Sequence, residues 1–259
     1  MAEYNPNYTA EDLLALYSFT GGVAKYVQLL VDAGATTKTK MLNHIIKADS
    51  VFLGEGKAIL IEEFGKDYGV YFSILSAIAR GKTLRSEIEQ IVGREIGGYL
   101  TKLEKEYEVI TKNQPIFEKS STKNVRYTIE DNFFTFWFRF IYKYNYMLEI
   151  ENYDAVKTII NRDYETFSGK MLERYFKRVL VESKAYTRIG SWWDRKGENE
   201  IDIVAENELN NKAVFIEVKR KEDNFDAIAL NDNVDVFTRA TGKFKDYDVS
   251  QKGLSMTDM

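Results

Sequence analysis

Apolar residues recur at helical spacing through the first third of the chain. Leu13 and Tyr17 precede the pair Gly21-Gly22, and a second apolar set with the same spacing follows that pair. Two glycines in succession interrupt an amphipathic pattern, so a helix is predicted on each side of them. With further helical patterns at Lys38–Ile46 and Glu55–Glu63, residues 1–66 are predicted to form a helical segment.

The middle of the chain has the order of elements typical of a winged helix. Three helical patterns are followed by two short β-type runs, with a polar loop between them. Three helices and a hairpin form a helix-turn-helix variant found in many DNA-binding modules. We therefore predict a winged-helix domain over residues 67–130, with the polar loop as its wing. The predicted helices are Tyr71–Arg80, Thr83–Val92 and Glu95–Tyr107, and the predicted strands are Val109–Thr111 and Arg126–Ile129.

The charge of the third of these helices does not favour DNA over other partners. Lys102 and Lys105 lie among Glu95, Glu104 and Glu106. Helices that read DNA usually carry a stronger positive charge, because contacts to phosphate supply much of the affinity. The predicted winged helix is therefore as compatible with a protein-interaction module as with a DNA reader, since a fold alone does not decide function.

A dense run of aromatic residues follows the predicted wing. The stretch Asp131–Glu151 reads as one aromatic helix, which we expect to bridge the domains within residues 131–160. Aromatic side chains bury large areas, so core or inter-domain packing is favoured over a surface that stacks on nucleic-acid bases. An oligomer interface formed by these rings is a further alternative.

The last third of the chain mixes helical and β-type patterns. Asn161–Ser183 has the apolar spacing of a long helix, and Arg188–Trp193 has the composition of a strand. The runs Ile201–Ala205 and Ala213–Val218 flank a polar stretch and predict a hairpin. A weaker helical pattern lies at Ala227–Phe237. These elements predict an α/β domain over residues 161–259, and the fold class expected for the whole chain is multidomain α+β.

Each strand of the predicted hairpin carries an acid among apolar neighbours. A turn near Leu209-Asn210 would place Asp202 opposite Glu217, and Lys219 would share the sheet face of Glu217. Facing carboxylates repel unless a cation lies between them. Two carboxylates suit a hard divalent cation such as Mg²⁺ or Mn²⁺, and a nearby lysine suits charge developing on a phosphate. The alternative is an exposed Glu–Lys pair, which the apolar neighbours disfavour.

Three further glutamates are weaker candidates for the same site. Glu173 lies in the long predicted helix, where a solvated side chain is the default interpretation, but the order of helix and sheet would bring it to the sheet edge. Glu200 precedes Asp202 by two residues and shares its face, and Glu198 lies nearby in the sequence. The run from Lys219 to Lys221 would either contact phosphates or form a solvated strand end.

Composition narrows the chemistry that these residues can perform. The 259 residues include no cysteine and one histidine, His44, which excludes thiolate sites and multi-histidine zinc sites. The formal charge of −4 argues against nucleic-acid binding over the whole surface. No stretch is apolar enough to cross a membrane, and a cytoplasmic location is expected. Gly81-Lys82-Thr83 lacks the strand and the earlier glycine of a phosphate-binding loop, so we interpret it as a turn between helices.

Taken in order, the segments resemble the C-terminal portion of archaeal-type AAA+ ATPases that end in a nuclease-like domain. The stretch LYSFTGGVAKYVQLL resembles the start of the helical lid of that family, although Ala24 stands where a proline is usual. The stretch VRYTIEDNFFTFWFRFIY resembles the bridge to the last domain and is the most distinctive. The stretch RIGSWWDRKGENEIDIVAENELNNKAVFIEVKR resembles the PD-(D/E)XK phosphodiesterase domain. The resemblance runs from about Leu13 to Lys221.

The resemblance assigns roles to four residues. It implies Asp202 and Glu217 as metal ligands, Lys219 as the catalytic lysine and Glu173 as the acid that completes the site, with Mg²⁺ or Mn²⁺ as the cofactor. The ATPase core of the family has no counterpart in these residues, so no ATP hydrolysis is expected of them. The segment after Lys221 is weakly patterned, although the nuclease fold requires further strand and helix elements there.

The function expected from these observations is Mg²⁺-dependent cleavage of DNA phosphodiester bonds. The alternative is a regulatory module that binds DNA or protein and keeps a vestigial nuclease site. The expected partners are DNA, the absent ATPase core or another protein, and a homo-oligomer is a third possibility. No membrane partner is expected.

Overall fold

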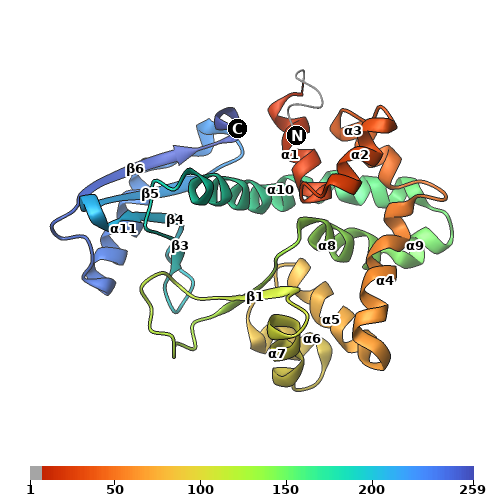
Figure 1. Ribbon diagram of the computed structural model, residues 1–259, viewed down its shortest axis with the longest axis horizontal. Coiled ribbons are helices and arrows are strands. Elements are labelled where there is room, and N and C mark those ends of the chain that lie inside the picture. Colours follow the sequence, from red (N-terminus) through yellow and green to blue (C-terminus); the bar gives the residue numbers. More distant parts are fainter. Residues whose placement is uncertain (1–7) are drawn as a thin grey trace. The chain divides into compact units, whose positions relative to one another are not determined.

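The computed structural model describes residues 8–259 as a mixed α+β protein, with a helical N-terminal region and a C-terminal mixed sheet (Figure 1). Over this range, no helix combines the length and apolarity needed to cross a membrane. The helices are α1 (Ala10–Thr20), α2 (Ala24–Asp32), α3 (Lys38–Ile45), α4 (Val51–Phe64), α5 (Tyr68–Ala79), α6 (Arg85–Val92), α7 (Gly97–Lys105), α8 (Asn132–Phe136), α9 (Asn145–Glu149), α10 (Tyr153–Ser183) and α11 (Ala227–Thr241). The strands are β1 (Ile110–Asn113), β2 (Arg126–Ile129), β3 (Arg188–Trp193), β4 (Glu200–Asn207), β5 (Lys212–Val218) and β6 (Asp248–Leu254).

The chain divides into two compact units. Unit 1 contains the described residues up to Asn113 together with Arg126–Glu165, and unit 2 contains Gln114–Val125 together with Thr166–Met259. The boundary therefore falls inside α10. This helix begins at Tyr153, earlier than the predicted Asn161, and its first turns belong to unit 1. Residues 1–7, which open the predicted helical segment, lie outside the described range.

The break between the first two helices of unit 1 lies where the sequence predicts. The side chain of Thr9 accepts the backbone N–H of Asp12 at 3.1 Å and caps the start of α1. Gly21 ends α1 in the left-handed conformation, with φ of 64°, which glycine adopts without strain. The predicted break between two helices is therefore confirmed.

Three helices and a two-stranded sheet follow in unit 1, as predicted. β1 and β2 pair antiparallel, with Ile110 opposite Ile129. Gly81 lies between α5 and α6 with φ of 93°, so Gly81-Lys82-Thr83 is a turn between two helices rather than a phosphate-binding loop.

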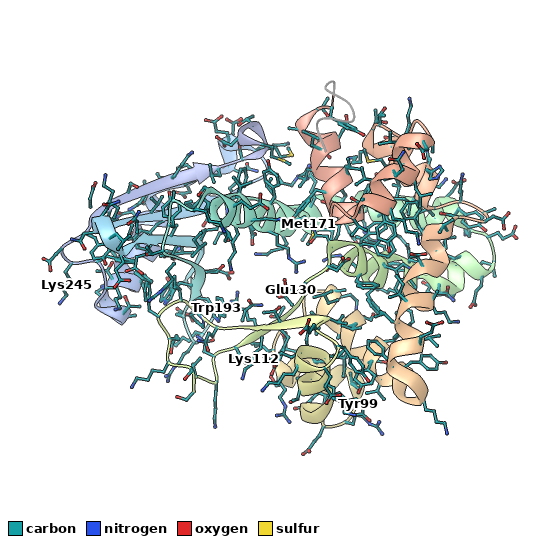
Figure 2. The ribbon with its side chains drawn as sticks, viewed as in Figure 1. Tyr99, Lys112, Glu130, Met171, Trp193 and Lys245 are labelled. Carbon is teal, nitrogen blue, oxygen red and sulfur yellow. The ribbon has the colours of Figure 1, made fainter. Side chains whose placement is uncertain are left out.

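The loop between β1 and β2, predicted as a wing, is part of unit 2. The backbone N–H of Ile116 donates to the carbonyl of Ser191 in β3 at 2.8 Å. The indole N–H of Trp193, which is labelled in Figure 2, donates to Asn124 Oδ1 at 2.9 Å. The ring of Phe117 packs against aromatic rings of α11 and the segment after it. Residues 114–125 therefore form part of the C-terminal core.

The sheet of unit 2 has the order β3-β4-β5-β6, in which only the pair β5–β6 is parallel. Helix α11 packs against β4, β5 and β6 (Figure 1). Its Phe237 meets Trp192 and Phe215 in a buried cluster. The weakly patterned tail thus supplies both a helix and a strand. β6 is exposed along most of its length, so its sequence has no apolar alternation to reveal it.

The aromatic stretch is not the single helix expected over Asp131–Glu151. α8 passes into a π-helical segment, Trp137–Tyr142, and α9 follows separately. A π turn shifts the side chains that follow it around the helix axis. The expectation that the rings form core is confirmed within unit 1, since most of them are buried, whereas Tyr146 and Ile150 are exposed. The buried residues are Phe133, Phe136, Trp137, Phe138, Phe140 and Ile141.

Trp137 fixes this segment against α4. Its indole N–H donates to the carbonyl of Leu53 at 3.1 Å, and its ring lies on the backbone of Gly56. A Cβ at Gly56 would overlap the indole, so only glycine permits this approach.

We predict that Gly56→Ala lowers the free energy of unfolding by about 1–3 kcal/mol, because the new methyl group must displace a buried ring. Chemical denaturation followed by Trp fluorescence would measure the change. Gly54→Ala is the matched control on the same helix, since a Cβ there meets no atom within 4 Å. It should be neutral or stabilising by up to about 1 kcal/mol. Equal effects of the two substitutions would contradict this account of Gly56.

Candidate functional site

The hairpin formed by β4 and β5 has the predicted register. Ile203 lies opposite Ile216, and Val204 lies opposite Phe215. One further step along this register brings Asp202 opposite Glu217. The backbone N–H of Val218 donates to Asp202 Oδ2 at 2.8 Å, which holds the Asp202 carboxylate against the end of β5.

The two acids lie in a strand pair whose other side chains are mostly buried. Ile201, Ile203 and Ile216 are at most 2% exposed, and the Glu217 side chain is 19% exposed. Partly buried carboxylates on facing strands repel one another and lose hydration, so they require compensating donors or cations.

Helix α10 adds a third carboxylate, that of Glu173. Met171, Leu172 and Phe176 are buried, which fixes the rotation of this part of the helix. The Glu173 side chain is 24% exposed and lies within electrostatic range of Asp202 and Glu217. The structure therefore brings together the three acids that the sequence singled out.

Two lysine amines lie against these carboxylates. Lys219 Nζ pairs with Glu217 Oε1, and it also lies within range of Asp202 and Glu173. Lys170 Nζ lies 2.9 Å from Glu173 Oε1 and 3.1 Å from Glu173 Oε2. Sequence reasoning missed Lys170, although its position one helical turn before Glu173 was a usable signal.

Burial, and then the charges of neighbouring groups, shift the pKa values of Asp202, Glu173 and Lys219. Burial, together with the carboxylates of Glu173 and Glu217, raises the pKa of Asp202 to about 7. Burial also raises the pKa of Glu173, with added repulsion from Glu200 and Glu217, and Lys170 opposes the shift. Burial lowers the pKa of the Lys219 amine, but its contact with Glu217 outweighs that effect, so this pKa is raised. Asp202 and Glu173 are thus held closer to their neutral forms, and the Lys219 amine closer to its charged form.

The two remaining candidate glutamates, Glu200 and Glu198, differ in their relation to the acidic cluster. Glu200 lies within electrostatic range of Glu173 and Lys170, and its carbonyl accepts the amide of Asn233 at 3.0 Å, so it belongs at the rim of the cluster. Glu198 lies in the turn between β3 and β4, where its carboxylate is 4.0 Å from Lys196 Nζ.

The basic run after β5 is not one patch. Lys219 faces the acids, whereas the guanidinium of Arg220 donates to the buried hydroxyl of Ser168 in α10. Arg220 therefore ties the end of β5 to the helix that carries Glu173. His44, the single histidine of the chain, lies in α3 of unit 1.

The donor chemistry of the cluster fits a hard divalent cation. Glu173, Asp202 and Glu217 supply carboxylate oxygens, which Mg²⁺ and Mn²⁺ prefer. Among the side chains that the structure describes, no three acidic or histidine groups already stand at the mutual spacing of a metal site. The amines of Lys170 and Lys219 contact two of the three carboxylates. A bound cation would therefore require small rearrangements of these side chains.

Comparison with known proteins identifies a similar family and a similar individual protein. Residues 137–246 match the DUF234 family, described as archaea bacterial proteins of unknown function. An uncharacterised protein of Methanocaldococcus jannaschii is 32% identical over 237 residues, which cover 86% of this chain and 51% of the relative. The chain thus spans about half the length of this curated relative. No solved structure matches the chain.

The raised pKa of Asp202 predicts how stability changes with pH in the absence of metal. The ordinary pKa of aspartate is about 4, so the folded state holds its proton more tightly than the unfolded state does. The unfolding free energy should therefore fall as the pH rises from about 4 to about 7. We predict that Asp202→Asn, whose amide oxygen still accepts the N–H of Val218, raises this free energy at pH 8 by roughly 1–3 kcal/mol.

The experiment is denaturant unfolding in EDTA at pH 5 and pH 8. The stabilisation by Asp202→Asn should be larger at pH 8 than at pH 5. Asp232→Asn, which neutralises an exposed acid on α11, is the control and should change stability little at either pH. A stabilisation by Asp202→Asn that is the same at both pH values would contradict the prediction.

Proposed function

We propose that the chain carries a divalent-metal-dependent phosphodiesterase site that cleaves DNA. The observation that carries this proposal is the hairpin, which places Asp202 opposite Glu217 with the Lys219 amine against Glu217. Glu173 of α10 joins the same cluster. Acids from two strands and one helix beside a lysine are the groups that metal-assisted phosphodiester hydrolysis requires.

Each residue has a distinct role in this proposal. Glu173, Asp202 and Glu217 would hold the cation, which when bound would neutralise phosphate charge and promote ionisation of a water. The Lys219 amine, kept protonated by its acidic neighbours, donates a hydrogen bond to the attacking water or to a phosphate oxygen. Arg220 keeps α10 and β5 together through Ser168, so the helix acid stays beside the strand acids.

We further propose that the chain corresponds to the C-terminal portion of an AAA+ ATPase of the archaeal type, with a winged-helix fold in α5–β2 and a PD-(D/E)XK fold in unit 2. The motif resemblance supports this relationship. ATP hydrolysis is not proposed for these residues. Gly54 and Lys57 lie within α4, and Gly81-Lys82-Thr83 lies between two helices, so neither glycine–lysine sequence follows a strand.

A non-catalytic regulatory module is the second candidate function. It is favoured by the two lysine amines that already contact Glu173 and Glu217, because a vestigial site would retain such ion pairs as structure. Under this alternative, binding to DNA or to a protein partner would survive Asp202→Asn in the presence of a chelator.

Metal binding separates the two candidates, and calorimetry with Mn²⁺ measures it directly. We predict that the unmodified chain binds Mn²⁺ and that the double variant Asp202→Asn/Glu217→Gln does not, because two of the three donors are lost. Glu208→Gln removes an exposed carboxylate near the turn of the same hairpin and should bind like the unmodified chain. Absence of binding in every protein would favour the regulatory module.

Cleavage of double- and single-stranded DNA with Mg²⁺ or Mn²⁺ then tests the chemistry. Lys219→Ala should lower the rate by about 10²-fold or more if its amine stabilises charge in the transition state. A Lys219→Ala protein that cuts DNA as fast as the unmodified chain would refute this role.

A further inference from the structure

Lys170 occupies a position that the proposed reaction does not use. It lies one helical turn before Glu173 on α10, and its amine lies near both oxygens of that carboxylate, at 2.9 and 3.1 Å. It is also within electrostatic range of Asp202 and Glu200, which come from β4. The Lys170 side chain is 63% exposed, so its amine can leave without unpacking the core.

The two strand acids have hydrogen-bond or ion-pair partners other than Lys170. Lys219 pairs with Glu217, and one oxygen of Asp202 accepts the N–H of Val218. Lys170 is the cation paired with Glu173. The amine of Lys170 therefore satisfies the Glu173 carboxylate that the proposed metal site requires as a ligand.

A second lysine on α10 shows what an ordinary helical pair looks like. Lys157 Nζ lies 2.6 Å from Asp154 Oδ1, again at a spacing of three residues. The Asp154 side chain is 92% exposed, whereas that of Glu173 is 24% exposed. The two pairs thus share a helix and a spacing, but the amine of Lys170 also lies within electrostatic range of Glu200 and Asp202.

We propose that Lys170 is an exchangeable counter-ion of the acidic site, which holds Glu173 until a divalent cation displaces its amine. This inference rests on the proposed metal site. An ammonium that contacts a carboxylate repels a divalent cation bound to the same carboxylate, so the Lys170 amine and the cation compete for Glu173. The lysine therefore sets the threshold of metal concentration at which the site fills.

The first test is the affinity for Mn²⁺, measured by calorimetry on the full chain at low ionic strength. Lys170→Met should bind Mn²⁺ about fivefold more tightly, since an exposed charge near a divalent ion is partly screened by water. Lys170→Arg keeps the charge and should bind like the unmodified chain. Lys157→Met is the matched control and should not change the affinity. The gain should shrink as salt is added.

The second test is thermal unfolding in EDTA. Here the loss of the Lys170 charge should be unfavourable, whereas it should favour Mn²⁺ binding. Without metal, Lys170→Met leaves the carboxylates less well balanced, so the melting temperature should fall by roughly 1–3 °C. Lys170→Arg should restore it. A purely structural role for Lys170 would lower stability without tightening metal binding, so the pair of opposite changes identifies the exchange.

The outcomes separate this inference from the proposed function. If the unmodified chain binds Mn²⁺ and Lys170→Met binds no more tightly, the exchange is refuted and the metal site stands. If neither protein binds Mn²⁺, the metal site fails and the exchange fails with it. Tighter binding by Lys170→Met, with Lys170→Arg like the unmodified chain, supports both.

Discussion

Two carboxylates held opposite each other in a mostly buried strand pair are the constraint on which the C-terminal unit depends. The register of β4 and β5 leaves Asp202 no position away from Glu217, because a shift by one residue would expose the apolar neighbours of both acids. The repulsion is therefore built into the same register that forms the core. The charged groups nearby either offset this repulsion or add to it.

Helix α10 carries some of these charged groups. Its buried residues fix the rotation that points Glu173 and Lys170 toward the hairpin, and Arg220 of the strand end donates to its buried Ser168. A third acid beside two that already repel one another lowers the stability of the fold unless a cation offsets its charge. The lysines compensate in the described structure, and a divalent ion would do so with greater charge.

Local sequence patterns predict some elements of the structure and miss others, for physical reasons. The β3 bounds and the hairpin register follow from local patterns, since apolar runs and turn residues determine them. β6 could not be predicted, because an exposed edge strand is held by backbone hydrogen bonds to β5. The packing of Trp137 on Gly56 joins residues 81 positions apart, so it leaves no periodic signal in the sequence. The spacing of Lys170 from Glu173 is visible in the sequence, but the nearness of this pair to the strand acids depends on how α10 packs.

The loop between β1 and β2 shows how such packing changes a functional interpretation. A wing that enters a DNA groove must be free along its length, but Ile116 and Asn124 are bonded to β3 and its end. The loop also covers an edge strand of the sheet, which protects it from pairing with another chain. The exposed charges of the loop, Lys119 and Lys123, lie near its tip. Contact of this loop with nucleic acid would therefore rely on charge at the tip rather than on insertion into a groove.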